Sequence, residues 1–332
     1  MEPWLIALIV LVSVSAFIAL VFFLWLFVLP RVIVHKMRAM PNPDGEMTYP
    51  ENFEELKEKV TVQKNLVYPS IYPANKYNLY LPKNCNKKVP LIIWVHGGGF
   101  IGGTKDGGDN VMIALSAADY AVASIDYAVA PEHKYPTAIR QVSEFTAHLQ
   151  AIYEKNPSID CNKVIFGGDS AGAQIAAQFV ATQSNIALAR EMKITQTIKP
   201  SALILVCGPF SFSAIRMFAA KTNKSFAMLV NIWGRMYFGG IRWHKGKKEK
   251  QANVILQANA YFPPTFLTDG NKGSFEAQNK KLAEKLKSCG VSVEELYFDE
   301  SYGEVPHEYL FHLHEETSQI AYKRICEFLE KI

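Results

Sequence analysis

The sequence predicts an α/β fold built on a mostly parallel sheet, with a membrane-spanning helix ahead of it. Short apolar runs alternate with helical patterns over most of the 332 residues, which is typical of strands joined by helices. Two of these runs, residues 91–95 (LIIWV) and 202–207 (ALILVC), are apolar throughout, as are strands covered on both faces. Hydrophobic residues make up 49% of the chain and charged residues 20%, a composition that excludes intrinsic disorder.

The first element is an apolar segment at residues 4–29, in which only Ser13 and Ser15 are polar. A helix of about 20 apolar residues is enough to span a bilayer, so we expect one transmembrane helix with some tilt. A cleaved signal peptide would show a basic start, a shorter apolar core and a small-residue cleavage site. The segment lacks these features, and we therefore expect an uncleaved, single-pass anchor.

The charges on either side of this segment predict its orientation. Glu2 precedes it, whereas Arg31, Lys36 and Arg38 follow it, so the positive-inside rule places the rest of the chain in the cytoplasm. Five cysteines without CxxC spacing or a Cys/His cluster argue against a disulfide framework or structural zinc, and they agree with a reducing compartment. The net charge of +4 does not indicate a nucleic-acid partner.

We expect three parts: an anchor with its basic flank at residues 1–38, a linker at 39–58 that ends in a short acidic helix, and the α/β domain at 59–332. Strands are expected at residues 60–67, 77–81, 91–95, 121–125, 163–166, 202–207, 265–268 and 293–298. Helices are expected at residues 110–118, 138–153, 171–182, 274–288 and 315–330.

Residues 168–172 read GDSAG and lie between a strand and a small-residue helix. A G-x-S-x-G sequence in this context indicates a nucleophile elbow, a strained turn that lifts the hydroxyl of Ser170 above the sheet. The start of the following helix directs its backbone N–H groups toward a developing oxyanion. The alternative is a tight turn with a capping serine.

Residues 96–100 read HGGGF and directly follow the strand at 91–95. Three glycines allow backbone N–H groups to face a ligand without interference from a Cβ atom. A phosphate-binding loop is also glycine-rich, but no GKS or GKT follows here and the nearest lysine is Lys105. The two motifs together are far more specific than either one alone.

The pair HGGGF and GDSAG resembles the α/β-hydrolase fold, in its hormone-sensitive-lipase-like and feruloyl-esterase-like carboxylesterase branches. Residues 126–133 (DYAVAPEH) are similar to the DYRLAPEH stretch of that group, with Ala128 in place of the usual arginine. The resemblance covers roughly residues 60–330. It implies an α/β-hydrolase domain with a serine nucleophile and no metal or organic cofactor.

The resemblance also implies roles for individual residues. Ser170 would be the nucleophile, and the N–H groups of Gly97, Gly98 and Ala171 would form the oxyanion hole. The order in this fold is serine, acid, histidine, so the base comes late in the chain. We predict His307, which follows a strand-like run and a loop, although the chain reads HEY where the family usually has HGF.

The acid is where the chain departs from the family pattern. After strand seven the family shows Gly-x-x-Asp, but Gly273 occupies the position of the aspartate. The local carboxylates are Asp269, at the end of the strand, and Glu276, one turn into the next helix. We expect Asp269 to be the acid because it is better placed to reach the base, and Glu276 remains the alternative.

The insertion at residues 211–262 falls where the fold carries its lid. It holds nine Lys and Arg residues against one acid, a net charge of +8, while the whole chain carries only +4. It is also rich in aromatic residues. A basic, aromatic lid suits the surface of an anionic membrane, and the same residues also suit an acyl pocket or an ordinary solvated cap.

The sequence thus predicts a membrane-anchored serine hydrolase that cleaves carboxylic esters through an acyl-enzyme intermediate. The expected partners are a lipid or acylated small-molecule ester and membrane lipid, without nucleic acid, and the oligomeric state is left open. Two alternatives stay open: a peptidase or amidase on the same fold, and a catalytically impaired binding scaffold. The absence of the family acid at Gly273 favours the scaffold.

Overall fold

The computed structural model describes residues 2–39, 45–83, 85 and 87–332. The chain divides into two compact units, Met1–Pro43 and Asp44–Ile332. The division falls within the expected linker, of which residues 40–44 lie outside the described residues.

The first unit is a long apolar helix. It consists of α1 (Pro3–Phe23), the π-helical turn η1 (Leu24–Val28) and α2 (Leu29–Arg38). Its most apolar stretch has a mean hydropathy of 3.0, so by length and composition the helix is a candidate membrane span. A signal sequence near an N-terminus can have the same length and composition. His35, Lys36 and Arg38 lie in its last turn.

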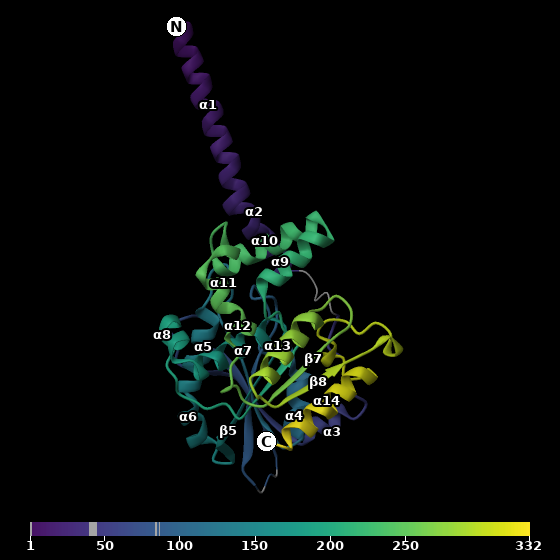
Figure 1. The fold of residues 1–332 in the computed structure, drawn as a ribbon. Coiled ribbons are helices and arrows are strands. Elements are labelled where there is room, and N and C mark those ends of the chain that lie inside the picture. Colours follow the sequence, from purple (N-terminus) through teal and green to yellow (C-terminus); the bar gives the residue numbers. More distant parts are fainter. Residues whose placement is uncertain (1, 40–44, 84, 86) are drawn as a thin grey trace. The chain divides into compact units, whose positions relative to one another are not determined.

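The second unit is built on an eight-stranded sheet in the order β1-β2-β4-β3-β5-β6-β7-β8 (Figure 1). The pairs β1–β2 and β2–β4 are antiparallel, and all the other pairs are parallel. All eight expected strands are present, with ends that differ by a few residues. They are β1 (Val60–Val67), β2 (Lys76–Pro82), β3 (Val89–Val95), β4 (Ala121–Ile125), β5 (Ile159–Asp169), β6 (Ala202–Val206), β7 (Thr265–Asp269) and β8 (Val293–Tyr297).

Helices cover both faces of this sheet (Figure 1). A core cluster on one face joins strand residues such as Ile92 and Phe266 to Val111 of α4 and Phe328 of α14. On the other face, α7 packs on β5 and on α5. The helices are α3 (Phe53–Glu58), α4 (Asp109–Ala117), α5 (Thr137–Ala147), α6 (Leu149–Lys155), α7 (Ala171–Ser184), α8 (Ile186–Met192), α13 (Glu276–Ser288) and α14 (Glu316–Leu329).

Three details differ from the expectation. The helix expected at residues 138–153 is divided at His148 into α5 and α6. The helix expected at 274–288 begins at Glu276, so Ser274 lies in the loop before it. The later part of the expected linker is packed rather than free, because Met47 and Phe53 contact the core.

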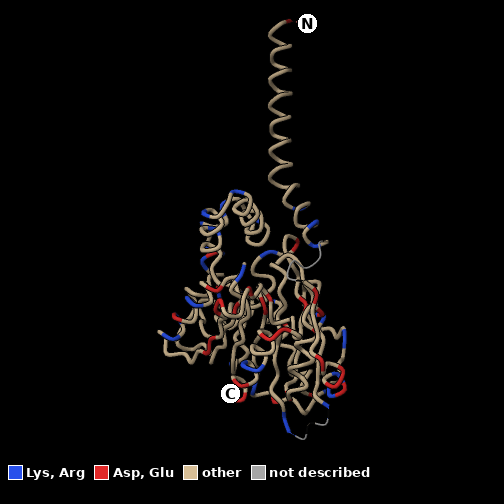
Figure 2. Tube along the Cα trace, turned by 90° about the vertical axis from the view of Figure 1, so that its right-hand side faces the viewer, with Lys and Arg blue, Asp and Glu red and all other residues tan. Residues whose placement is uncertain are grey.

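The expected insertion is helical and lies between β6 and β7. It contains α9 (Phe212–Thr222), α10 (Lys224–Phe238), η2 (Trp243–Lys245), α11 (Lys247–Ala252) and α12 (Val254–Gln257). Lys and Arg residues are spread along the hairpin that α9 and α10 form (Figure 2). We call this insertion, residues 211–262, the lid.

Candidate active site

Ser170 lies in a sharp turn between β5 and α7. Its backbone has φ 48° and ψ −118°, a left-handed conformation that costs a residue with a side chain about 1–3 kcal/mol. The turn is tight because a Cβ at Gly168 would lie 2.7 Å from the carbonyl oxygen of Val95, and one at Gly172 would lie 1.9 Å from the same atom. The two glycines therefore let the elbow sit directly against β3.

His307 lies in the loop between η3 (Glu300–Tyr302) and η4 (Tyr309–Phe311) and faces Ser170. Its Nε2 is 2.9 Å from the Oγ of Ser170, which is hydrogen-bond distance for a base and its nucleophile. Burial lowers the pKa of His307 to about 4. The imidazole is therefore neutral near pH 7, and a neutral ring nitrogen can accept the proton of the serine hydroxyl.

Asp269 is the last residue of β7 and is connected to His307 through the hydroxyl of Ser274. The Oγ of Ser274 lies 2.6 Å from the Nδ1 of His307, and the same hydroxyl donates to the Oδ1 of Asp269. The other carboxylate oxygen accepts from the N–H of Phe275 at 3.0 Å and from the Nδ2 of Asn279 at 2.8 Å. Burial raises the pKa of the Asp269 carboxyl to about 7.

The structure separates the two carboxylates that the sequence left open. Glu276 pairs with Lys280 one turn along α13, whereas Asp269 shares a hydrogen-bonded partner with His307. Sequence reasoning missed Ser274, which it assigned to the start of a helix. The available signal was a serine directly after Gly273, the position at which the resemblance implies an acid.

The three residues whose N–H groups are expected to bind the oxyanion differ in their backbone environment. The N–H of Gly97 donates to the Oδ2 of Asp169 at 2.6 Å, so in this conformation it already has an acceptor. Gly98 adopts φ +106°, a backbone conformation that favours glycine. Ala171 is the first residue of α7, so its N–H has no acceptor within the helix.

Two further carboxyl side chains, those of Asp169 and Glu308, lie beside the elbow. Asp169, which precedes Ser170, accepts from the Nε1 of Trp94 at 2.8 Å and is hydrogen-bonded to Glu308, which follows His307. Burial raises the pKa of the Asp169 carboxyl to about 6. The residues next to the nucleophile and the base are therefore linked to one another.

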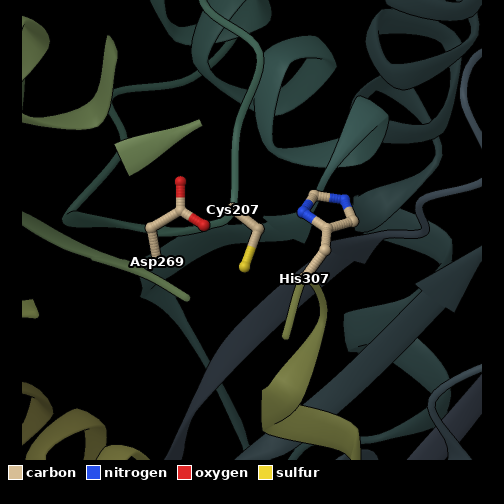
Figure 3. Close-up of side chains that lie close together, drawn as sticks. All are labelled: Cys207, Asp269 and His307. Atoms are coloured by element: carbon tan, nitrogen blue, oxygen red, sulfur yellow. The ribbon is translucent and has the colours of Figure 1, made fainter. Parts of the chain in front are cut away.

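Cys207, Asp269 and His307 form the one group of possible metal ligands found among the described residues, with ligand atoms within 4.8 Å of one another (Figure 3). Burial raises the pKa of the Cys207 thiol well above its ordinary value, so the thiol is protonated in this structure. The hydroxyl of Ser274 also bonds to both Asp269 and His307. This set fits a hydrogen-bonded network better than a metal centre.

The lid packs on the HGGGF loop. The Nε1 of Trp233 in α10 donates to the carbonyl oxygen of Gly99. Phe100 stacks on Tyr237 with ring centroids 4.2 Å apart and contacts Phe212 at 5.2 Å. Aromatic residues of the lid thus cover the loop that is expected to hold the oxyanion.

Comparisons with known proteins bear on the fold and its family. A family model described as the alpha/beta hydrolase fold matches residues 92–310. The esterase LipI of Mycobacterium tuberculosis is 36% identical over 102 residues, which are 30% of this chain and 32% of that protein. The probable carboxylesterase 13 of Arabidopsis thaliana is 32% identical over 165 residues, which are 44% of this chain and 49% of that protein.

The matches to these two relatives span half of their length or less. Among solved structures, esterase B from Lactobacillus rhamnosis superposes with a TM-score of 0.71 at 20% identity, and the alignment covers 96% of both chains. At that identity the likeness concerns the fold.

Proposed function

Because the chain belongs to the alpha/beta hydrolase fold family, we propose that it is a carboxylic ester hydrolase with Ser170 as nucleophile and His307 as general base. The observation that carries the proposal is the 2.9 Å contact between the Oγ of Ser170 and the Nε2 of His307 at a strained elbow. Esterases and carboxylesterases among its relatives support the reaction class.

The proposed reaction has two steps. Ser170 attacks the ester carbonyl while His307 accepts its proton, and His307 then donates that proton to the leaving alcohol. Water, activated by His307, releases the acid from the acyl-enzyme. The N–H groups of Gly98 and Ala171 stabilise the tetrahedral intermediate, and Gly97 joins them when it leaves Asp169. One such donor contributes about 10²–10³ in rate.

The direct test is hydrolysis of a series of p-nitrophenyl esters, from acetate to decanoate, by the full chain in detergent micelles. We expect turnover that is lost in Ser170→Ala and in His307→Ala. His314→Ala is the matched control, because His314 is exposed and contacts Thr48 rather than the site. A folded wild-type protein without turnover on any ester would refute the proposal.

We also propose that the helix at Pro3–Arg38 anchors the protein in a membrane, with the 59–332 domain on the cytoplasmic side, and that the lid rests on anionic lipid. The hairpin of α9 and α10 supports the contact of the lid with lipid. Its apolar residues Met217, Phe218 and Met228 are 60%, 65% and 54% exposed. Two lysines of the same hairpin, Lys221 and Lys224, are also exposed. Each such lysine contributes about 1 kcal/mol near an anionic surface.

The lid proposal is tested with the full chain in vesicles of phosphatidylcholine, with and without phosphatidylserine. We expect phosphatidylserine to raise hydrolysis of a bilayer-dissolved ester, and Lys221→Glu/Lys224→Glu to abolish that gain. Lys155→Glu/Lys199→Glu changes the same charge on exposed residues outside the lid and should retain it. Equal behaviour of the two double variants would contradict a lid that rests on lipid.

A further inference from the structure

We propose that Ser274 is a positioning residue of this hydrolase, whose hydroxyl connects Asp269 to His307 and fixes the His307 tautomer that accepts the Ser170 proton. The inference rests on the proposed function, in which Ser170 and His307 carry the reaction. It assigns to a serine hydroxyl the contact with the base that a carboxylate makes in a Ser-His-Asp triad.

The contacts of Ser274 carry the proposal. Its Oγ is 2.6 Å from the Nδ1 of His307 and is hydrogen-bonded to the Oδ1 of Asp269. The structure shows no direct hydrogen bond between Asp269 and His307, both of which it describes. The acid therefore reaches the base through one intervening hydroxyl.

The chemistry of the three groups fixes the direction of every proton. Above about pH 7 Asp269 is ionised, and an ionised carboxylate only accepts hydrogen bonds, so the O–H of Ser274 points to Asp269. The remaining lone pairs of Ser274 face His307, whose Nδ1 must then carry the proton and donate it. The Nε2 is left with its lone pair, 2.9 Å from the hydroxyl of Ser170, in the form that a general base requires.

The surroundings hold Asp269 away from the imidazole. Its backbone is part of β7, paired with Tyr297 of β8, and its Oδ2 is held by the N–H of Phe275 and the amide of Asn279. Asn279 is itself tied to the carbonyl oxygen of Gly208 at 3.1 Å. A carboxylate held in this way does not need to move if a hydroxyl spans the remaining distance.

Gly273 shows why the chain needs such a bridge. It lies in the loop between β7 and α13, directly before Ser274, and has no side chain. It adopts φ +67°, and a Cβ added to it would have no atom within 4 Å. No carboxylate therefore reaches His307 from residue 273. Ser274, the next residue, supplies the hydroxyl instead.

The test compares Ser274→Ala, Ser274→Thr, Asp269→Asn and the double variant Ser274→Ala/Asp269→Asn in the full chain, with p-nitrophenyl butyrate as substrate. We expect Ser274→Ala to lower kcat by about 10²–10⁴-fold, as does loss of an orienting or proton-transferring group, with little change in KM. Ser274→Thr keeps the hydroxyl and should recover most of the rate. Ser288→Ala removes a hydroxyl at the far end of α13 and serves as control.

Two readouts separate positioning from a merely structural role. If Asp269 acts through Ser274, the double variant is no slower than the slower single variant, because both substitutions break the same link. The dependence of kcat on pH below about 8 should also flatten in Ser274→Ala, since the ionisation of Asp269 is no longer transmitted to His307. If Ser274→Ala does not fold, Ser274→Cys, which keeps the shape but donates weakly, replaces it in both measurements.

The outcomes distinguish this inference from the proposed function. A wild-type rate in Ser274→Ala, with an unchanged pH profile, would overturn the role of Ser274 while leaving the esterase intact. Additive losses in the double variant would also overturn it. A wild-type protein with no turnover and no reaction of Ser170 with a fluorophosphonate would instead remove the proposed function.

Discussion

The N–H of Gly97 donates a 2.6 Å hydrogen bond to the Oδ2 of Asp169, and this contact joins the HGGGF loop to the nucleophile elbow. The same carboxylate accepts from Trp94 at 2.8 Å and is hydrogen-bonded to Glu308. One buried carboxylate therefore holds together the segments that carry the expected oxyanion donors, the nucleophile and the base.

Replacing this carboxylate by an amide should weaken all three segments. We predict that Asp169→Asn lowers the free energy of unfolding by about 1–3 kcal/mol. Gly97 and Trp94 donate to different oxygens of Asp169, and the amide nitrogen that replaces one of these oxygens cannot accept. Thermal unfolding and ester turnover should both decline. Asp119→Asn, at an exposed ion pair with Lys87, is the control, and an equal melting temperature for the two variants would contradict the role of Asp169.

The elbow leaves no room for a side chain at Gly172. A Cβ there would lie 1.9 Å from the carbonyl oxygen of Val95, so we predict that Gly172→Ala displaces the turn and abolishes reaction of Ser170 with a fluorophosphonate probe. Gly107→Ala, where the nearest contact of a Cβ is 3.2 Å, should react normally. Normal labelling of Gly172→Ala would show that the elbow is looser than described.

The identity of the acid is tested by two amide substitutions. We predict that Asp269→Asn lowers kcat by about 10²–10⁴-fold, toward the loss seen when a triad acid is removed. Glu276→Gln should leave kcat unchanged, because Glu276 pairs with Lys280. The reverse pattern in steady-state kinetics would assign the acid to Glu276.

The pH dependence follows from the ionisation of the same carboxyl. Burial raises the pKa of Asp269 to about 7 and lowers the pKa of His307 to about 4, so Asp269 gains a proton first as pH falls. We predict that kcat/KM declines below about pH 7, where a protonated Asp269 no longer requires Nδ1 of His307 to carry the proton.

Cys207, Tyr309 and Tyr297 stay neutral over this range, because their pKa values all lie well above their ordinary values. The Asp169 carboxyl beside Ser170 gains its proton at a lower pH, because its pKa is about 6. The decline that begins near pH 7 is therefore assigned to Asp269 and should disappear in Asp269→Asn. A decline that persists in this variant would point to another group.

Much of the fold was predictable because it is encoded locally. Apolar runs and strand–helix alternation located all eight strands, and the GDSAG motif predicted the elbow at Ser170. What could not be predicted depends on contacts between distant segments. The bridge from Ser274 to His307 spans 33 residues, and the engagement of Gly97 by Asp169 spans 72. Neither leaves a periodic pattern in the sequence.

The measurement that tests the central claim most directly is covalent labelling of the full chain with a fluorophosphonate, followed by mass spectrometry of the modified peptide. The account predicts stoichiometric labelling at Ser170, absent in Ser170→Ala and much slower in His307→Ala, because an activated serine needs its base. A folded wild-type protein that does not react, or that reacts equally without His307, would contradict the account.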